Sequence, residues 1–102
     1  MILDTFALHG RVALVTGSTR GLGQGAAVAL AEAGADVALL DRGDASATAE
    51  RVRATGRRAH LLRRDLVSAG PEELAGAVDE TVAELGGLDI LVNNAGTIRR
   101  TP

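Results

Sequence analysis

Short apolar runs alternate along the chain with longer segments in which apolar residues recur at helical spacing. Each run is continuous and ends at a glycine or a polar residue, which is typical of a buried strand. The runs predict strands over residues 12–15, 37–40, 59–62 and 89–92. The segments between them predict helices over residues 21–33, 45–54 and 71–85. The predicted order of elements is therefore β-α-β-α-β-α-β.

The helical segments differ in how clearly they mark a buried face. The first carries apolar residues at helical spacing, which are Leu22, Ala26, Val28 and Leu30. In the third, Pro71 suits a first helical turn and Gly86 suits the position after a last one. Between them runs a single apolar stripe of Leu74, Val78, Val82 and Leu85.

The order of elements predicts an α/β fold of the Rossmann type, a doubly wound parallel sheet. Strands joined by helices of this length must run parallel. In a doubly wound sheet of strand order 3-2-1-4, the first two helices lie on one face and the third on the other. One helix cannot cover four strands, so we expect part of its face to be bare and the fourth strand to form an apolar edge.

Composition excludes several classes of protein. Thirteen acidic residues and eleven basic ones, all arginine, leave a net charge of −2, which does not suit a nucleic-acid-binding surface. The absence of cysteine excludes disulfides and thiolate metal sites. The N-terminus has no basic signal-peptide region, and no apolar run approaches the roughly 18 residues of a membrane span. We therefore expect a soluble cytoplasmic protein with no nucleic-acid or membrane partner. His9 and His60 lack partners at metal-ligand spacing and are interpreted as structural or surface residues, with no metal site.

A glycine-rich segment connects the first predicted strand to the first helix. It consists of Thr16, Gly17, Ser18, Thr19, Arg20, Gly21, Leu22 and Gly23. Gly17 would allow a tight turn, Gly21 would let the backbone approach a pyrophosphate, and Gly23 would let the helix pack closely on the strand. Phosphates would then lie at the positive end of the helix. The segment predicts a dinucleotide site, with a glycine-rich turn that binds nothing as the alternative.

Asp41 ends the second predicted strand, near the offset at which an acid meets the adenosine ribose. Its carboxylate would accept hydrogen bonds from the ribose hydroxyls and repel a 2′-phosphate, which favours NAD. Arg20 and Arg42 could attract that phosphate, so NADP remains possible. The alternative interpretation of Asp41 is a solvated acid at the end of a strand.

The spacing of the glycines resembles the cofactor turn of the short-chain dehydrogenase/reductase family. Two further motifs in the expected order carry the same resemblance: Asp65-Leu66 after the third strand, and Asn93-Asn94-Ala95-Gly96 after the fourth. The resemblance implies that Asp65 and Leu66 hold the adenine. It also implies that Asn93, Ala95 and Gly96 line the cofactor while the tetrapeptide ties the central strands together. Taken alone, Asp65 would be interpreted as a helix cap or a surface acid, and Asn93-Asn94 as a turn.

The same resemblance implies an NAD(P)-dependent enzyme whose catalytic tyrosine, lysine and serine follow the fourth strand. The sequence contains no tyrosine and no lysine, so no catalytic residue is assigned within it. We expect residues 1–102 to be the dinucleotide-binding half of a longer chain, apparently truncated after the fourth strand. The missing helices would build a homo-oligomer, a tetramer in this family. The alternative is a nucleotide-binding module without catalysis.

A finer resemblance concerns the small-molecule substrate. The opening residues 1–6, the run Gly21–Gly25 and the tail Ile98–Arg100 resemble members of the family that act on sugar acids. This implies hydride transfer between nicotinamide and a secondary alcohol or ketone of an anionic sugar acid. The substrate carboxylate could meet Arg99 or Arg100, with a solvated surface pair as the alternative interpretation of these arginines. The rival is a 3-oxoacyl-type reductase that uses NADP, which Arg20 suits and Asp41 opposes.

Overall fold

A computed structural model describes residues 7–19, 21–65 and 71–94. The elements within these ranges are β1 (Val12–Thr16), α1 (Gly21–Glu32), β2 (Asp36–Asp41), α2 (Ser46–Arg53), β3 (Ala59–Arg63), α4 (Pro71–Leu85) and β4 (Ile90–Asn93). Each lies within one residue of the element that the hydrophobic pattern predicts, so the predicted order is confirmed.

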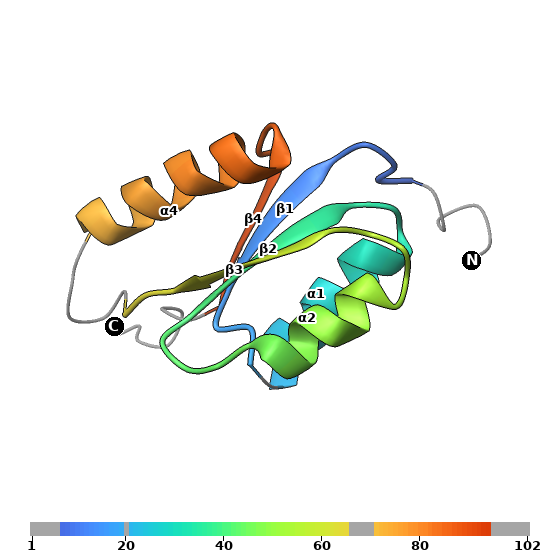
Figure 1. Ribbon diagram of the computed structural model, residues 1–102, viewed down its shortest axis with the longest axis horizontal. Coiled ribbons are helices and arrows are strands. Elements are labelled where there is room, and N and C mark those ends of the chain that lie inside the picture. The colour runs from blue at the N-terminus through green and yellow to red at the C-terminus, as the bar shows by residue number, and fades with distance from the viewer. Residues whose placement is uncertain (1–6, 20, 66–70, 95–102) are drawn as a thin grey trace, which may run out of the picture.

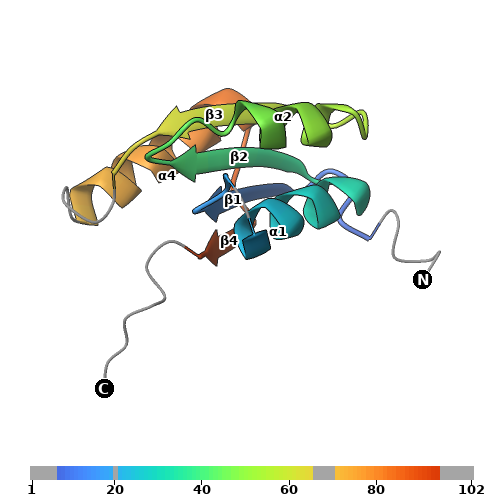
Figure 2. The same ribbon diagram turned by 90° about the horizontal axis from the view of Figure 1, so that it is seen from below.

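The four strands form one parallel sheet in the order β3-β2-β1-β4, as Figure 2 shows. Helices α1 and α2 lie on one face and α4 on the other (Figure 1). Alternate strand residues serve the two faces: Val15 and Leu39 pack toward α1 and α2, whereas Leu14 and Leu40 pack toward α4. All four side chains are buried, which explains why the strands appear in the sequence as unbroken apolar runs. The predicted doubly wound fold is confirmed.

Helix α1 packs on the sheet through its smallest residues. Its buried residues are Gly23, Ala27 and Ala31, whereas Leu22 is 84% exposed. Leu22 precedes Ala27 by five positions, which places the two about 140° apart around the helix axis. The row of small residues lets the helix backbone approach the sheet closely, while Leu22 lies on the side that faces solvent.

Helix α4 also departs from the expected stripe. Its buried residues are Ala77, Thr81 and Leu85, and Val82 is 45% exposed. Val82 follows the buried Thr81 by one position, so the two side chains lie about 100° apart around the helix axis. Val82 therefore lies at the margin of the buried face, where larger side chains remain in water.

Strand β4, at the edge of the sheet, is less covered than its neighbour β1. Helix α4 packs over β1, β2 and β3. Leu91 of β4 pairs in register with the buried Leu14 of β1, yet Leu91 is 46% exposed. Within the described residues, the face that α4 occupies is therefore bare over β4, as expected for one helix on four strands.

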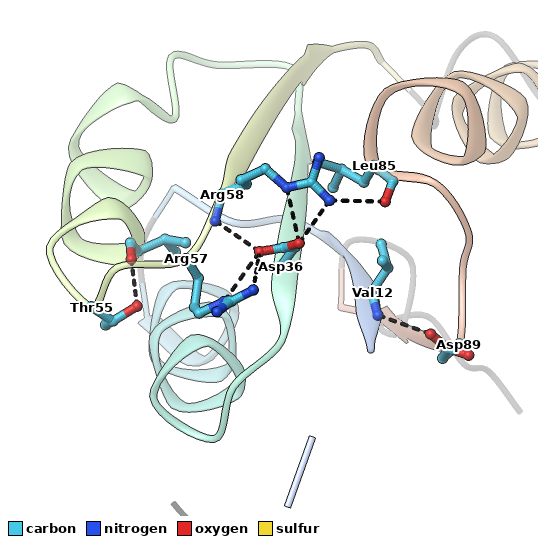
Figure 3. Close-up of polar contacts among 8 residues, drawn as sticks. Val12, Asp36, Thr55, Arg57, Arg58, Leu85 and Asp89 are labelled. Carbon is cyan, nitrogen blue, oxygen red and sulfur yellow. Dashed lines mark hydrogen bonds and ion pairs between the residues drawn. The ribbon is translucent and has the colours of Figure 1, made fainter. Parts of the chain in front are cut away.

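A cluster of polar contacts lies at the amino ends of the strands, opposite the glycine-rich turn (Figure 3). The carboxylate of Asp36, 7% exposed, accepts hydrogen bonds from the Arg58 backbone N–H (2.9 Å), Arg58 Nε (3.0 Å) and Arg57 Nε (3.2 Å). Arg58 Nη2 also donates to the Leu85 carbonyl oxygen (3.1 Å), which links β2 and the start of β3 to the end of α4. Burial raises the pKa of Asp36, but the N–H and guanidinium of Arg58 and the charge of Arg57 lower it more. The pKa of Asp36 therefore lies below its ordinary value of 3.8.

Candidate functional site

The glycine-rich turn leaves the carboxyl end of β1 in a conformation that requires glycine. Gly17 and Gly21 have φ angles of 68° and 59°, in the left-handed region that side chains disfavour. A Cβ atom at Gly23 would lie 1.7 Å from the Gly17 carbonyl oxygen, so only glycine fits where α1 crosses the turn. This agrees with the close packing expected of Gly23. At Gly21 a Cβ would meet nothing within 4 Å, so the space beside the helix start is open.

Two carbonyl oxygens of the turn are held by side chains from other elements. The Gly17 oxygen accepts a hydrogen bond from Asn94 Nδ2 (3.3 Å), and the Ser18 oxygen accepts one from Thr48 Oγ1 (2.7 Å). Ser18 itself is buried, and its hydroxyl lies 3.4 Å from the Leu40 carbonyl oxygen. These contacts direct both carbonyl oxygens toward the protein. An anion that approached the turn would therefore not face them.

Helix α1 begins at Gly21 with its first backbone N–H groups free of partners within the helix, as at every helix start. Its first turn contains no acidic residue, so no carboxylate of its own neutralises the positive end. Helix α4 differs, because Glu72 and Glu73 occupy its first turn. Leu22 is exposed beside the start of α1. The amino end of α1 is thus suited to an external anion, with an apolar side chain next to it.

Asp41 lies at the carboxyl end of β2, beside the turn. Its Oδ2 accepts a hydrogen bond from the Thr19 N–H (3.1 Å) and its Oδ1 accepts one from the Gly43 N–H (2.8 Å). The carboxylate is half-buried, and each oxygen of a carboxylate has a second lone pair for a further donor. The two backbone contacts therefore orient Asp41 without using up its capacity to accept hydrogen bonds.

Arginine residues adjoin the same end of the sheet. Arg42 follows Asp41 and is exposed, and its carbonyl oxygen accepts a hydrogen bond from Arg63 Nε (3.1 Å). Arg20, the other arginine that could attract a 2′-phosphate, lies outside the described residues. The acidic Asp41 and the basic Arg42 are thus neighbours at the end of β2.

The turn is tied to β4 through polar side chains. Thr16 Oγ1 donates to Asn93 Oδ1 at 3.0 Å and lies 3.4 Å from the Val92 carbonyl oxygen. Together with the contact from Asn94 to the turn, this links the carboxyl ends of β1 and β4, as the resemblance implies. Asp65 follows β3 and is half-buried. Leu66, Ala95 and Gly96 lie outside the described residues.

A small cavity opens near this edge, between the β2–α2 connection and β3. It measures about 130 Å³ and is lined by Leu39, Gly43, Asp44, Ala45, Leu61, Leu62 and Arg63. Ligand pockets commonly enclose roughly 300–1,000 Å³. The cavity is therefore too small for a dinucleotide, and neither Asp41 nor the glycine-rich turn lines it. The candidate site is the open edge where the turn, Asp41 and Asn93 meet.

Among the described residues, the remaining polar groups form no second site. His60 Nε2 lies 2.7 Å from Glu80 Oε2, and this hydrogen bond, with smaller effects from Arg64, lowers the pKa of Glu80. The contact joins β3 to α4. No group of three or more potential metal ligands occurs in the part of the chain that the structure describes. In that same part, no helix combines the length and apolarity needed to cross a membrane.

Two side chains that shape the turn carry no motif of their own in the sequence. Thr48 holds the Ser18 carbonyl oxygen, and Gln24 donates to the Thr48 hydroxyl (3.0 Å). The only available signal is helical spacing, which places Thr48 on the same face of the predicted helix as the buried Ala49 and Val52. A polar residue on an apolar helix face indicates a buried hydrogen bond, but the sequence does not show which group is its partner.

Comparison with known proteins identifies the family. The family model for short chain dehydrogenases matches residues 11–102, which is most of the chain. The chain belongs to the short-chain dehydrogenase family. The resemblance carried by the three sequence motifs is thereby confirmed.

Individual members of the short-chain dehydrogenase family are also similar. The chain is 51% identical over 100 residues to a Dickeya dadantii protein named 2-dehydro-3-deoxy-D-gluconate 5-dehydrogenase, which covers 98% of this chain and 39% of that protein. It is also 51% identical over 96 residues to the rhamnolipids biosynthesis 3-oxoacyl-(acyl-carrier-protein) reductase of Pseudomonas aeruginosa, covering 90% of this chain and 36% of that one. The similarity to sugar-acid dehydrogenases inferred from the sequence is therefore confirmed, and the chain spans about two fifths of the length of these relatives.

The fold agrees with solved structures of the family. Carveol dehydrogenase from Mycobacterium avium, in a crystal structure with NAD, superposes with a TM-score of 0.78 at 36% identity. The superposition covers 87% of this chain and 36% of that one. The described residues therefore correspond to one part of a larger short-chain dehydrogenase fold.

Proposed function

We propose that this chain forms the NAD-binding part of a dehydrogenase that acts on a sugar acid. The observation that carries the proposal is Asp41, whose carboxylate is oriented by the Thr19 and Gly43 N–H groups beside the glycine-rich turn. A carboxylate placed there is suited to receive the two hydroxyls of an adenosine ribose. When bound, the nicotinamide would supply or accept the hydride, and this chain would hold the other end of the cofactor.

The start of α1 is suited to the pyrophosphate. Its first N–H groups have no partner within the helix and its first turn has no acidic residue, so this end attracts anions, and the open space beside Gly21 lets a phosphate approach the backbone. The carbonyl oxygens of Gly17 and Ser18 point into the protein, so they do not repel the phosphates. Leu22 would contact the cofactor through its exposed side chain. Asp65 and Leu66 would hold the adenine, and Asn93, Ala95 and Gly96 would line the cofactor, as in the family.

Asp41→Asn tests this assignment by removing the charge and one acceptor oxygen. Hydrogen bonds to a charged group contribute about 1.5–3 kcal/mol, so in the full protein the Kd for NAD should rise by about ten- to a hundredfold. The Kd for NADP should fall, because the charge that repels a 2′-phosphate is gone. Calorimetric titration with both dinucleotides measures the two changes.

Asp44→Asn is the matched control, since it removes the same charge three residues away from an exposed position. Asp44 accepts hydrogen bonds from the N–H and hydroxyl of Ser46, at the start of α2. Its replacement should leave the preference for NAD over NADP unchanged. A preference that survives in Asp41→Asn would contradict the proposed role of Asp41.

The substrate proposal rests on the similarity to the Dickeya dadantii enzyme. The full protein, given NAD and 2-dehydro-3-deoxy-D-gluconate, is expected to produce NADH, which absorbance reports directly. The second candidate is a 3-oxoacyl reductase, favoured by the similarity to the Pseudomonas aeruginosa enzyme. Turnover of a 3-oxoacyl thioester with NADPH, and none of the sugar acid, would decide for that candidate.

A further inference from the structure

One peptide group of the glycine-rich turn is held at both of its ends. The Ser18 carbonyl oxygen accepts a hydrogen bond from Thr48 Oγ1 at 2.7 Å, and the Thr19 N–H donates to Asp41 Oδ2 at 3.1 Å. These two groups belong to the same planar, trans peptide, so they point in opposite directions. Rotation of the peptide would break both hydrogen bonds together. Thr48 and Asp41, which come from different elements, thus act on one backbone unit.

The place of Thr48 in α2 leaves its hydroxyl without the usual partner inside the helix. A buried helical threonine commonly donates to the carbonyl oxygen four residues earlier in its own helix, as Thr81 of α4 does with Ala77 at 2.8 Å. Thr48 is the third residue of α2, so the residue four positions earlier, Asp44, precedes the helix. Thr48 is equally buried, and its hydroxyl donates instead to the Ser18 carbonyl oxygen, 30 positions away in the chain. The buried hydroxyl of Thr48 is therefore satisfied by the turn itself.

Further side chains support this direction. Gln24 Nε2 donates to Thr48 Oγ1 at 3.0 Å, and Gln24 Oε1 accepts from Arg51 Nη1 at 3.3 Å. The Thr48 oxygen therefore accepts a hydrogen bond from Gln24, which leaves its only proton for the Ser18 oxygen. Donors and acceptors alternate from Arg51 to Ser18, and such chains polarise each bond in the same sense.

We propose that Thr48 is a positioning residue that sets the affinity and selectivity of the dinucleotide site by acting on the Ser18–Thr19 peptide. This rests on the proposed NAD-binding function. With the peptide held, the Ser18 carbonyl oxygen stays directed away from the phosphate position. The Thr19 N–H stays on Asp41, so the carboxylate keeps the orientation in which it meets the ribose. Thr48 itself touches no part of the cofactor.

Thr48→Val in the full protein tests this role, because valine has nearly the same shape and lacks the hydroxyl. The Kd for NAD is expected to rise about tenfold, the effect of one internal hydrogen bond, while the Kd for NADP changes less. In an Asp41→Ala background, which has no acceptor left for the Thr19 N–H, the same replacement should raise the Kd for NAD by less than about twofold, since the other end of the peptide is already released. Amide hydrogen exchange at Thr19, followed by NMR without cofactor, should become faster in Thr48→Val.

Thr81→Val is the matched control, because it removes an equally buried hydroxyl from a helix on the opposite face of the sheet. It should lower stability without changing the Kd for NAD or the exchange at Thr19. Thr48→Ser keeps the hydroxyl and should retain the affinity of the parent protein. If Thr48→Val does not fold, Thr48→Cys, whose thiol is a weak donor, should give an intermediate Kd.

Three results would overturn the proposal: an unchanged Kd for NAD in Thr48→Val, an equal loss in Thr81→Val, or a loss in Thr48→Ser as large as that in Thr48→Val. Failure of the proposed function has a different signature. In that case the parent protein binds neither dinucleotide, while exchange at Thr19 still becomes faster in Thr48→Val. This result would show that Thr48 holds the Ser18–Thr19 peptide but that the turn is not a cofactor site. An unchanged exchange rate at Thr19 would show that Thr48 does not hold the Ser18–Thr19 peptide.

Discussion

Gly23→Ala is expected to disrupt the turn and abolish dinucleotide binding. The added Cβ would lie 1.7 Å from the Gly17 carbonyl oxygen and 2.7 Å from the Gly17 carbonyl carbon. These are backbone atoms that cannot rotate away, and the Gly17 N–H is bonded to the Leu40 carbonyl oxygen at 2.9 Å. Overpacking of this severity should cost about 3 kcal/mol or more of the free energy of unfolding. Urea denaturation measures this loss, and calorimetry with NAD measures the binding.

Gly25→Ala is the control in the same helix. Gly25 is exposed, and a Cβ there would meet nothing within 4 Å. Alanine is the better helix former, so this variant should gain about 0.5–1 kcal/mol of stability. If Gly23→Ala were as stable as the parent protein and still bound NAD, α1 could not cross the turn as closely as the structure has it.

Asp36→Asn is expected to have the second largest effect, at the opposite end of the sheet. The change removes the charge that faces the guanidinium groups of Arg57 and Arg58. Removing one partner of a buried ion pair costs about 3–5 kcal/mol, and since Arg58 is 60% exposed we expect about 2–3 kcal/mol. Dinucleotide affinity of the folded protein should not change, because Asp36 lies at the amino end of β2. Urea denaturation at neutral pH provides the measurement.

The contribution of Asp36 should also depend on pH. Because its pKa is lower in the folded protein than its ordinary value of 3.8, the unfolded chain takes up a proton first on acidification. The stabilisation is therefore complete above the ordinary pKa and is lost as the pH falls through the lower value of the folded state. The difference in unfolding free energy between the parent protein and Asp36→Asn should shrink between about pH 7 and about pH 3.

Asp79→Asn controls for loss of an acidic side chain at an exposed position of α4. It should alter the free energy of unfolding by no more than about 0.5 kcal/mol at either pH. An equal loss from Asp36→Asn and Asp79→Asn would mean that the buried contacts of Asp36 contribute nothing specific.

The strand order and the glycine-rich turn could be predicted because both depend on local signals. The run Val12–Thr16 is apolar throughout since each residue is buried, whichever face of the sheet it serves. At Gly17 and Gly21 the left-handed backbone itself requires glycine, so the turn can be recognised from the residue type at these two positions. The alternation of strands and helices predicts a parallel sheet of the Rossmann type, and right-handed crossovers then determine which helices share a face.

The buried faces of the helices were harder to predict from the sequence. Size suggests that Leu22 and Val82 are inside, yet both are exposed. Gly23 and Thr81 are buried instead, because close approach to the sheet favours small side chains over large ones. The hydrophobic pattern locates a helix, but the distance between helix and sheet decides which of its residues fit between them.

The sequence by itself determined the order of the elements, the parallel sheet, the turn that only glycine can form, and the family to which the chain belongs. Each follows from a pattern within a few consecutive residues or from a motif at a given spacing. Only the tertiary structure decided that Thr48 and Asp41 hold one peptide from opposite sides, and that Asp36 joins β2 to Arg57 and Arg58. Each of these contacts joins residues 20 to 30 positions apart in the chain and depends on the direction in which a single side chain points. Those directions arise only once the sheet and its helices have packed.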